Sequence, residues 1–484
     1  MVSRSSLASS SSSTRGGTLA PPAPEYILRG HSAPISVLGF SRCAQYLFSG
    51  DTDGFVAVWD LSTFRPRYFW RAHDAGILGL VELGDQGLLS HGRDNLLHLH
   101  RFPSRTDASS IADHGAATAV PSPATPSTGI ERAWSLDVNA MSFCRMSVCL
   151  VGGRTREAKG KERAVEQDRP DEEALVAVPS LTKDDFVDIF HYPSKARAHR
   201  SVGAGAFVGQ KTGTVMATQL FYLASPDTPR PPRPAVAEQA LPTEADAALP
   251  PPSLHILIAY ESGQLALFRF APTRTFDLVP TPSTSPAPAR SRSPLYLPRQ
   301  GVRVEESEGW ELVWVEKGHR DAIMSLAVTA DQRFAYTVGA DHHMVAYRLV
   351  DANDAEAGLP RSHTELTASA GKAAVVVRED AKVLATAGWD GEARFYKAKT
   401  LEPLAVLSHH RTSLQAAAFA PLNPTAPSPV FSDCPTDDDD DDEVAGGAGR
   451  AGGTRRAWLA TGGQEAKIGL WEVYPPRRAV ARAP

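Results

Sequence analysis

One spacing recurs along the chain and limits the folds open to it. A Ser or Thr is followed four positions later by an acidic residue, and six positions after that by an aromatic or histidine ring. The frame occurs at Ser49-Asp53-Trp59, Ser90-Asp94-His100, Ser180-Asp184-Phe190, Thr337-Asp341-Tyr347, Thr386-Asp390-Tyr396 and, with Glu in place of Asp, Thr461-Glu465-Trp471. Because self-similarity of this kind marks one structural unit used many times, we expect a repeat architecture.

Each frame also has the pattern of two strands joined by a tight turn. The segment Phe55–Trp59, which follows Gly54, is rich in the β-branched and aromatic residues that favour a strand. The hydroxyl residue would end one strand, the acid would occupy the turn, and the ring would close the next strand. The chain is therefore expected to be all-β.

A histidine stands upstream of three frames. These are His31, His73 and His319, which precede the acid of their frames by 22, 21 and 22 residues. A histidine, a hydroxyl, a carboxylate and a ring at these distances resemble the structural tetrad of WD repeats, and Gly30-His31 and Trp59-Asp60 resemble the signature pairs of that class. The resemblance implies that the carboxylate accepts a hydrogen bond from the imidazole, which bonds in turn to the hydroxyl. The predicted tetrad members are His31, Ser49, Asp53, Trp59, His73, Ser90, Asp94, His319, Thr337, Asp341, Thr386, Asp390, Thr461 and Trp471.

Any one of these His–Asp sets could also be interpreted as catalytic. A catalytic site occurs once in an enzyme, whereas this pattern occurs once per repeat, so the structural interpretation is favoured. The Gly447-x-Gly449-x-x-Gly452 match lies in a Gly-rich loop with no strand before it and no helix after it, which argues against a dinucleotide site. The four cysteines form no CxxC pair and no metal-ligand spacing. We expect no catalytic residue, no cofactor and no metal.

Two more repeats complete the count. The segment Leu254–Phe270 has the strand–turn–strand shape with Ser262 at the position of the acid, and Leu404–Phe419 opens a last repeat that ends at Trp471. The sequence thus predicts one seven-bladed WD-repeat β-propeller over residues 21–475, a blade number within the usual range. The expected blades are 26–70, 71–102, 131–194, 199–270, 310–349, 365–399 and 402–475. The strand near Glu25–Arg29 should join the last blade and close the ring.

Five long insertions and two tails interrupt or flank the repeats. The insertions cover residues 103–129, 152–173, 224–253, 271–309 and 421–456, and their Pro-, Ser-, Gly- or charge-rich composition is typical of disorder. Residues 1–20 form a Ser-rich tail that we also expect to be disordered, and residues 476–484 form a basic tail. The acidic run Asp437–Glu443 is interpreted as a solvated spacer, with capture of a basic partner as the alternative.

The insertions should all lie on one face of the ring. In a blade of four antiparallel strands, the first–second and third–fourth connections lie on one face, and the five insertions fall at such connections. We call the opposite face the clear face and expect a partner to dock there. The residues just before the turn acids project onto it, and we predict partner contacts from Arg93, Trp389, Lys183 and Gln464, since Trp and Arg are enriched at interface hot spots.

Charge and hydropathy argue against nucleic-acid binding and against a membrane-spanning segment. The formal net charge is −5, and no strong basic stripe points to direct nucleic-acid binding. No apolar stretch approaches the ~18 residues that a membrane span needs. We therefore expect an intracellular protein that binds other proteins.

Several short motifs resemble those of the ASTRA-associated protein 1 family of fungi, whose animal relative is a G-protein-beta-subunit-like protein. They are Tyr26–His31, Ser49–Gly54, Arg65-Pro66, Trp70–His73, His91–Asn95, Ala259–Gly263, Ala387–Gly391 and Lys467–Tyr474. The motifs are spread over all seven expected blades, and His91-Gly92-Arg93-Asp94-Asn95 is more particular than a general WD match. The long insertions depart from the compact family pattern.

This resemblance implies a non-catalytic scaffold subunit of the nuclear ASTRA complex, with a place in the cytoplasm also open. The implied partners are a giant kinase-like scaffold, its cochaperones and the RuvB-like ATPases, and the implied roles are chromatin remodelling and maturation of phosphatidylinositol-3-kinase-related kinases. The alternative is a substrate receptor of a cullin-type ubiquitin ligase. Such receptors tend to carry Arg two residues after the Trp-Asp pair, whereas Trp59-Asp60 is followed by Leu61-Ser62. An enzyme using the central channel would need a carboxylate or metal-ligand cluster that the sequence does not reveal.

Overall fold

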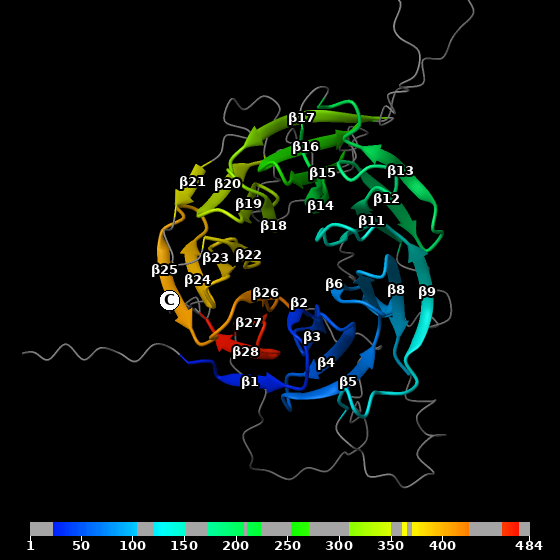
Figure 1. Ribbon diagram of the computed structural model, residues 1–484, viewed down its shortest axis with the longest axis vertical. Helices are drawn as coiled ribbons and strands as arrows, with labels where there is room; N and C mark the ends of the chain where they lie inside the picture. The colour runs from blue at the N-terminus through cyan, green and yellow to red at the C-terminus, as the bar shows by residue number, and fades with distance from the viewer. Residues whose placement is uncertain are drawn as a thin grey trace, which may run out of the picture.

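The computed structural model describes residues 23–103, 121–151, 173–207, 211–223, 253–271, 309–349, 361–364, 370–424 and 457–473. They form seven antiparallel four-stranded sheets arranged as blades around a central axis (Figure 1). Within a blade the strands pair in chain order from the inside outward, except that the last blade takes its outermost strand from the N-terminal side of the chain. The predicted seven-bladed β-propeller is confirmed.

The strands of the first four blades are regular and short. Blade 1 contains β2 (Ile35–Phe40), β3 (Tyr46–Asp51), β4 (Phe55–Asp60) and β5 (Arg65–Arg71), and blade 2 contains β6 (Ile77–Glu82), β7 (Leu88–Gly92), β8 (Leu96–Arg101) and β9 (Glu131–Asp137). Blade 3 contains β10 (Ser147–Leu150), β11 (Ala174–Pro179), β12 (Val187–Tyr192) and β13 (Arg197–Val202), and blade 4 contains β14 (Val215–Leu223), β15 (Ser253–Tyr260), β16 (Gln264–Phe270) and β17 (Trp310–Lys317).

The other three blades follow the same plan. Blade 5 contains β18 (Ile323–Val328), β19 (Phe334–Gly339), β20 (His343–Arg348) and β21 (Arg361–Thr364), and blade 6 contains β22 (Lys372–Val377), β23 (Val383–Gly388), β24 (Glu392–Lys397) and β25 (Pro403–Ser408). Blade 7 contains β26 (Leu414–Phe419), β27 (Trp458–Gly463), β28 (Lys467–Glu472) and β1 (Tyr26–Arg29). A single turn of 3-10 helix, η1 (Gly84–Gln86), joins β6 to β7, and no helix in the described residues is long and apolar enough to cross a membrane.

Each blade buries both faces of its inner strands against its neighbours. Every residue of β3 and β11 is buried, whereas most residues of the outer strands β5 and β25 are half-buried or exposed. The apolar clusters therefore lie between blades. One of them joins Ile35, Leu47 and Trp59 of blade 1 to Trp458 and Leu470 of blade 7. Since burial of apolar surface is the main favourable term in folding, a blade depends on its two neighbours.

Ring closure comes from the pairing of the two ends of the propeller. Strand β1 pairs antiparallel with β28, with Tyr26 opposite Leu470 and Arg29 opposite Lys467. Leu28 is buried in the cluster between blades 7 and 1. The expectation that the strand near Glu25–Arg29 joins the last blade is confirmed.

The blade limits differ from the expected ones at five outer strands. Residues 131–137 were expected to open the third blade, but β9 pairs with β8 and completes blade 2. In the same way β13, β17 and β25, each expected in the following blade, complete blades 3, 4 and 6. Strand β21, which lies beyond the expected limit at residue 349, completes blade 5. The reason is that a repeat in the sequence is offset by one strand from a blade in space, and a long insertion between two paired strands hides that pairing.

The strand ends that flank the five insertions all lie on one face of the ring, which we call the insertion face. Each insertion lies between the first and second or the third and fourth strands of a blade. Part of the first one is described: the backbone N–H of Ser127 donates to the Phe69 carbonyl at 2.7 Å, and Ser127 Oγ accepts from the Phe69 N–H at 2.9 Å. Residues 121–129 therefore lie along the outer strand β5, where we had expected disorder. The tails 1–20 and 476–484 and the acidic run 437–443 lie outside the described residues.

The closing strand should be necessary for stability. Replacing Leu28 by Ala should lower the free energy of unfolding by about 2–5 kcal/mol, because it removes a buried side chain from the contact between the two ends of the ring. The neighbouring exposed Arg29→Ala should change it by less than about 0.5 kcal/mol. Thermal melts of both variants beside the wild type would test this. Equal melting temperatures for Leu28→Ala and the wild type would show that the ring does not need β1.

Candidate functional site

The hydrogen-bond network of blade 1 shows how a frame holds a blade together. Trp59 Nε1 donates to Ser49 Oγ at 2.7 Å, and His31 Nε2 lies 2.7 Å from the same oxygen. His31 Nδ1 lies 2.7 Å from Asp51 Oδ2. Since an ionised carboxylate can only accept, the imidazole donates from Nδ1 and its Nε2 accepts the Ser49 proton. The result is a buried relay of hydrogen bonds from indole to hydroxyl to imidazole to carboxylate.

The carboxylate of this relay is Asp51, and the prediction of Asp53 was wrong. Asp51 is fully buried, whereas Asp53 is exposed in the turn. The second oxygen of Asp51 accepts the backbone N–H groups of Asp53 and Phe55 at 3.0 and 2.9 Å. Asp51 stands only two residues after Ser49 and so lies outside the frame that predicted Asp53, but its position at the end of β3 directs its side chain to His31.

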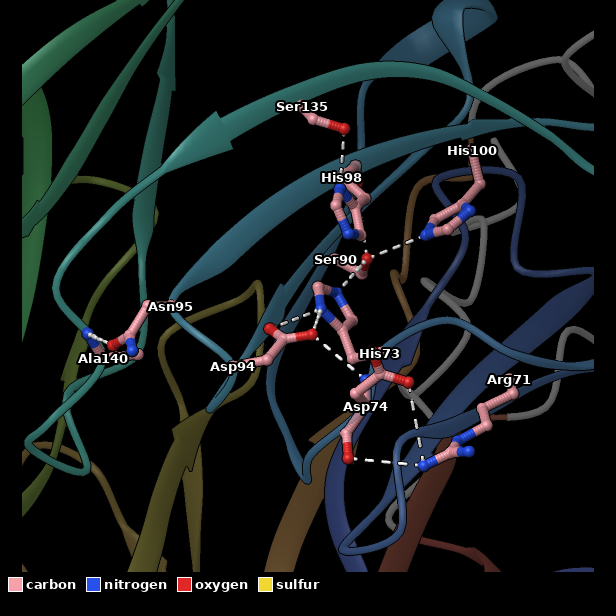
Figure 2. Close-up of polar contacts among 10 residues, drawn as sticks. All are labelled: Arg71, His73, Asp74, Ser90, Asp94, Asn95, His98, His100, Ser135 and Ala140. Carbon is pink, nitrogen blue, oxygen red and sulfur yellow. Dashed lines mark hydrogen bonds and ion pairs between the residues drawn. The ribbon is translucent and has the colours of Figure 1, made fainter.

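Blade 2 has the same relay with a histidine in place of the indole (Figure 2). His73 Nδ1 lies 2.9 Å from Asp94 Oδ1, and His73 Nε2 lies 2.8 Å from Ser90 Oγ. His100 Nε2 lies 2.9 Å from the Ser90 oxygen and takes the place of Trp59 Nε1 in blade 1. His98 stacks on His73 with ring centroids 4.7 Å apart.

The histidines of blade 2 are held in the neutral form. Burial, with repulsion from His73, lowers the pKa of His91 and of His100 to about 3 and that of His98 to about 4. These rings lie inside the blade, where the positive charge of a protonated imidazole would be poorly solvated. They therefore act as hydrogen-bonding core residues near neutral pH.

Three side chains of blade 2 lie close enough together to ligate one metal ion. His73, Asp94 and His98 place ligand atoms within 4.8 Å of one another. Both nitrogens of His73 are already used, one by Asp94 and one by Ser90. An ion would have to break the relay that holds the blade, so the geometry favours the structural role.

Blades 5 and 7 keep most of the relay. His319 bonds Thr337 Oγ1 at 2.8 Å and Asp341 Oδ1 at 2.9 Å. Burial alone would raise the pKa of Asp341, but hydrogen bonds from His319 and the backbone outweigh it and hold that pKa at about 2. In blade 7 Trp471 Nε1 donates to Thr461 Oγ1 at 2.9 Å, and His410, which the spacing did not identify, lies 3.0 Å from the same oxygen.

Blades 3 and 6 depart from the relay. In blade 6 no described histidine bonds Thr386 or Asp390; Asp390 instead binds both terminal nitrogens of Arg394 at 3.0 and 2.6 Å. The prediction that Thr386 and Asp390 belong to a tetrad was therefore wrong, because the nearest donor is an arginine on the next strand. In blade 3 Ser180 donates to the buried Asp188 at 3.0 Å, and Asp188 lies outside the frame.

The clear face carries a cavity at the mouth of the central channel. Its volume is about 640 Å³, and its lining includes Thr52, Arg93 and Gln464 from turns together with Phe143 and Arg145 from the connection between β9 and β10. Two of the four predicted partner-binding residues, Arg93 and Gln464, thus lie in one site. A second cavity of about 430 Å³ lies further along the channel and shares Arg145 in its lining.

The other two predicted contact residues lie elsewhere. Lys183 lines a separate hollow with Asp184, Asp185 and Glu261, and its ammonium lies 5.0 Å from the centre of the Phe186 ring. Trp389 is half-buried, and its ring lies so close to Gly371 that a Cβ there would come within 1.9 Å of it. Their roles as partner contacts stay predictions.

Arg145 is the functional candidate that the sequence did not reveal. It extends from the start of blade 3 across the channel, where Nη2 donates to the carbonyls of Ser36 at 3.0 Å and Gln415 at 3.4 Å. These acceptors belong to blades 1 and 7. Nothing in the repeat spacing indicates that the connection before β10 turns into the channel, so no sequence signal could have found this residue.

The comparisons with known proteins agree with this geometry. The model of the WD domain, G-beta repeat matches residues 22–60, which include β1 to β4 and the relay of blade 1. With seven blades and relays of this kind, the chain is a WD-repeat β-propeller.

Relatives that match over most of the chain point to a narrower group of proteins than the WD-repeat match does. The chain is 29% identical to ASTRA-associated protein 1 of Aspergillus niger, over 94% of this chain and 98% of the relative. It is 29% identical to the protein of that name from Pyricularia oryzae over the same shares, and 27% identical to that of Schizosaccharomyces pombe over 83% of this chain and 94% of the relative. The resemblance to the ASTRA-associated protein 1 family is confirmed.

The two aspartates of the first frame should differ sharply in their effect on stability. Asp51→Ala should lower the free energy of unfolding by about 3 kcal/mol, because hydrogen bonds to a charged group contribute about 1.5–3 kcal/mol each. The exposed Asp53→Ala should change it by less than about 0.5 kcal/mol. Urea unfolding of the two variants measures the difference. The reverse order would restore Asp53 as the relay carboxylate.

The neutral histidines should make the fold sensitive to acid. Their folded-state pKa values lie below the ordinary value of 6.5, so the unfolded chain binds more protons below that pH. Their contribution to stability is complete above about pH 6.5 and decreases as the pH falls toward 3, by about 2 kcal/mol per histidine at pH 5. In His100→Phe the loss of stability between pH 7 and about pH 5 should be smaller by that amount. An unchanged loss, measured by urea unfolding, would contradict a neutral His100.

Proposed function

We propose that this chain is a non-catalytic WD-repeat scaffold subunit of the nuclear ASTRA complex. The observation that carries the proposal is the match to proteins named ASTRA-associated protein 1, which covers nearly all of this chain and nearly all of each relative. A match of this extent includes every blade. The proposal extends to the roles of that assembly in chromatin remodelling and in the maturation of phosphatidylinositol-3-kinase-related kinases.

The state of the polar residues supports a binding role. Within the described residues, the His–Asp sets of blades 1, 2 and 5 are hydrogen-bonded inside their blades, as His31 is to Ser49 and Asp51. The groups left to meet a ligand lie on the clear face, where short turns surround a cavity. Since a fold of this class hosts many functions, the partner assignment depends on the relatives and on experiment.

The partners are proposed to be a giant kinase-like scaffold, its cochaperones and the RuvB-like ATPases. Affinity purification of the tagged chain from nuclei of its own cells should recover these proteins. An Arg93→Ala, Gln464→Ala double variant should recover at least about tenfold less, which corresponds to the loss of one hot-spot contact. Arg320→Ala, an exposed arginine on the clear face that does not line the cavity, is the matched control and should recover wild-type amounts.

Other outcomes would reject parts of the proposal. Recovery of cullin adaptors without ASTRA subunits would favour the ubiquitin-ligase alternative. Absence of the tagged chain from nuclei would contradict the nuclear assignment. Equal recovery by the double variant would keep the complex but exclude this cavity as the docking site.

A further inference from the structure

The charged side chains that line the clear-face cavity are all positive. Its lining carries the guanidinium groups of Arg93 and Arg145 and no carboxylate, and its other polar residues are neutral. Within the described part of the chain neither arginine forms an ion pair. Field lines concentrate in a cleft lined by charges of one sign, so the cavity attracts anionic groups. Its volume of about 640 Å³ is in the range of sites that enclose a ligand.

Arg145 is held in place for such a ligand. The carbonyls of Ser36 and Gln415, on two other blades, accept hydrogen bonds from its Nη2 and fix the guanidinium in the channel. Burial lowers the pKa of Arg145, and no nearby carboxylate offsets this effect. Burying a charged group without an ion-pair partner is unfavourable. A bound carboxylate would therefore stabilise the charged guanidinium of Arg145.

Exposed apolar residues lie on two connections beside the cavity, and one of these residues lines it. Met141, Phe143 and Leu181 are 77%, 57% and 51% exposed, more than any other large hydrophobic residue that the structure describes. The two connections that carry them are joined by the hydrogen bond from Asn139 Nδ2 to the Ser180 carbonyl at 2.7 Å. Phe143 also lines the cavity, and the Arg93 guanidinium lies 4.7 Å from the centre of its ring. Exposed apolar groups gathered in this way mark an interaction surface.

We infer that this surface binds an extended acidic segment of a partner protein. An Asp or Glu side chain would insert between Arg93 and Arg145, and neighbouring apolar side chains would cover Phe143, Met141 and Leu181. This inference deepens the proposed scaffold role and rests on it. The same chemistry disfavours a basic ligand. The exposed acids Asp53, Asp74 and Asp321 elsewhere on the clear face confine the attraction for anions to the cavity, so a segment with one or two acidic side chains fits better than the continuous phosphate charge of a nucleic acid.

The occupant should come from another protein. This chain has an acidic run of its own at 437–443, but the strands that flank it, β26 and β27, lead into it from the insertion face. The cavity opens on the other side of the ring, among the turns that precede the inner strands. We therefore include the chain's own run only as an alternative occupant in the test.

Selection from a random library of 12-residue peptides displayed on phage, with the purified full-length chain as bait, tests the inference. The selected peptides should be enriched in Asp or Glu next to Leu, Phe or Met. A selected peptide, labelled with fluorescein, should bind at least about tenfold more weakly to Arg93→Gln and to Phe143→Ala, as expected for hot-spot contacts. Arg320→Gln, the matched arginine on the same face, should change its affinity by less than about twofold.

The design separates a binding defect from a folding defect. Arg145→Gln should also weaken binding, but it removes two hydrogen bonds between blades, so its melting temperature is measured too. The Arg93 side chain makes no hydrogen bond within the described residues, and its variant alone decides the question if Arg145→Gln does not fold. A peptide with the sequence of residues 433–446 that competes at lower concentration than the selected peptides would assign the site to the chain's own acidic run.

Besides occupation by the chain's own acidic run, three results would overturn the inference. They are no enrichment, enrichment of basic peptides, or acidic peptides whose affinity is unchanged by Arg93→Gln. Failure here with normal recovery of ASTRA subunits from cells would reject the acidic segment and keep the proposed complex. Acidic peptides bound through Arg93, with no ASTRA subunits recovered, would reject the complex and keep the site.

Discussion

The pairing of β1 with β28 is the constraint on which the rest of the structure depends. Each blade buries its inner strands against two neighbours, so an open ring would expose the facing sides of blades 1 and 7, including Trp59 and Trp458. Closing with a strand from the other end of the chain means that neither terminal blade can separate without breaking a sheet. The antiparallel strand order within each blade separates the insertion face from the clear face.

Within the closed ring, the relay varies between blades, and the acid keeps a hydrogen-bond partner in the two blades where a donor is replaced. Blade 2 replaces an indole by His100, and blade 6 replaces an imidazole by Arg394, which pairs with Asp390. A buried polar group without a partner is costly, so the acid and its donor change together. This is why the blades keep one shape although their relay residues differ.

The repeat spacing predicted the fold well because it records strand length and turn position, which the backbone determines. Seven blades and the closing strand follow from it. The spacing was less informative about side-chain direction: it selected Asp53, whereas the structure shows that the buried acid is Asp51, which lies outside the frame. It gave no information about Arg145, since that residue reaches the channel through a connection whose path depends on the neighbouring blades.

The part of the candidate site that carries Phe143 and Arg145 lies where the relay is absent. In blades 1, 2, 5 and 7 a relay histidine anchors the connection that leads into the first strand, as His31 does before β2. In blade 3 Asn139 takes that position and bonds the Ser180 carbonyl, and the connection after it carries Met141, Phe143 and Arg145. Released from the relay, this connection can extend one arginine into the channel and expose two apolar side chains above it. Departures from a repeated structural rule are expected where function replaces stability, and blade 3 is such a departure.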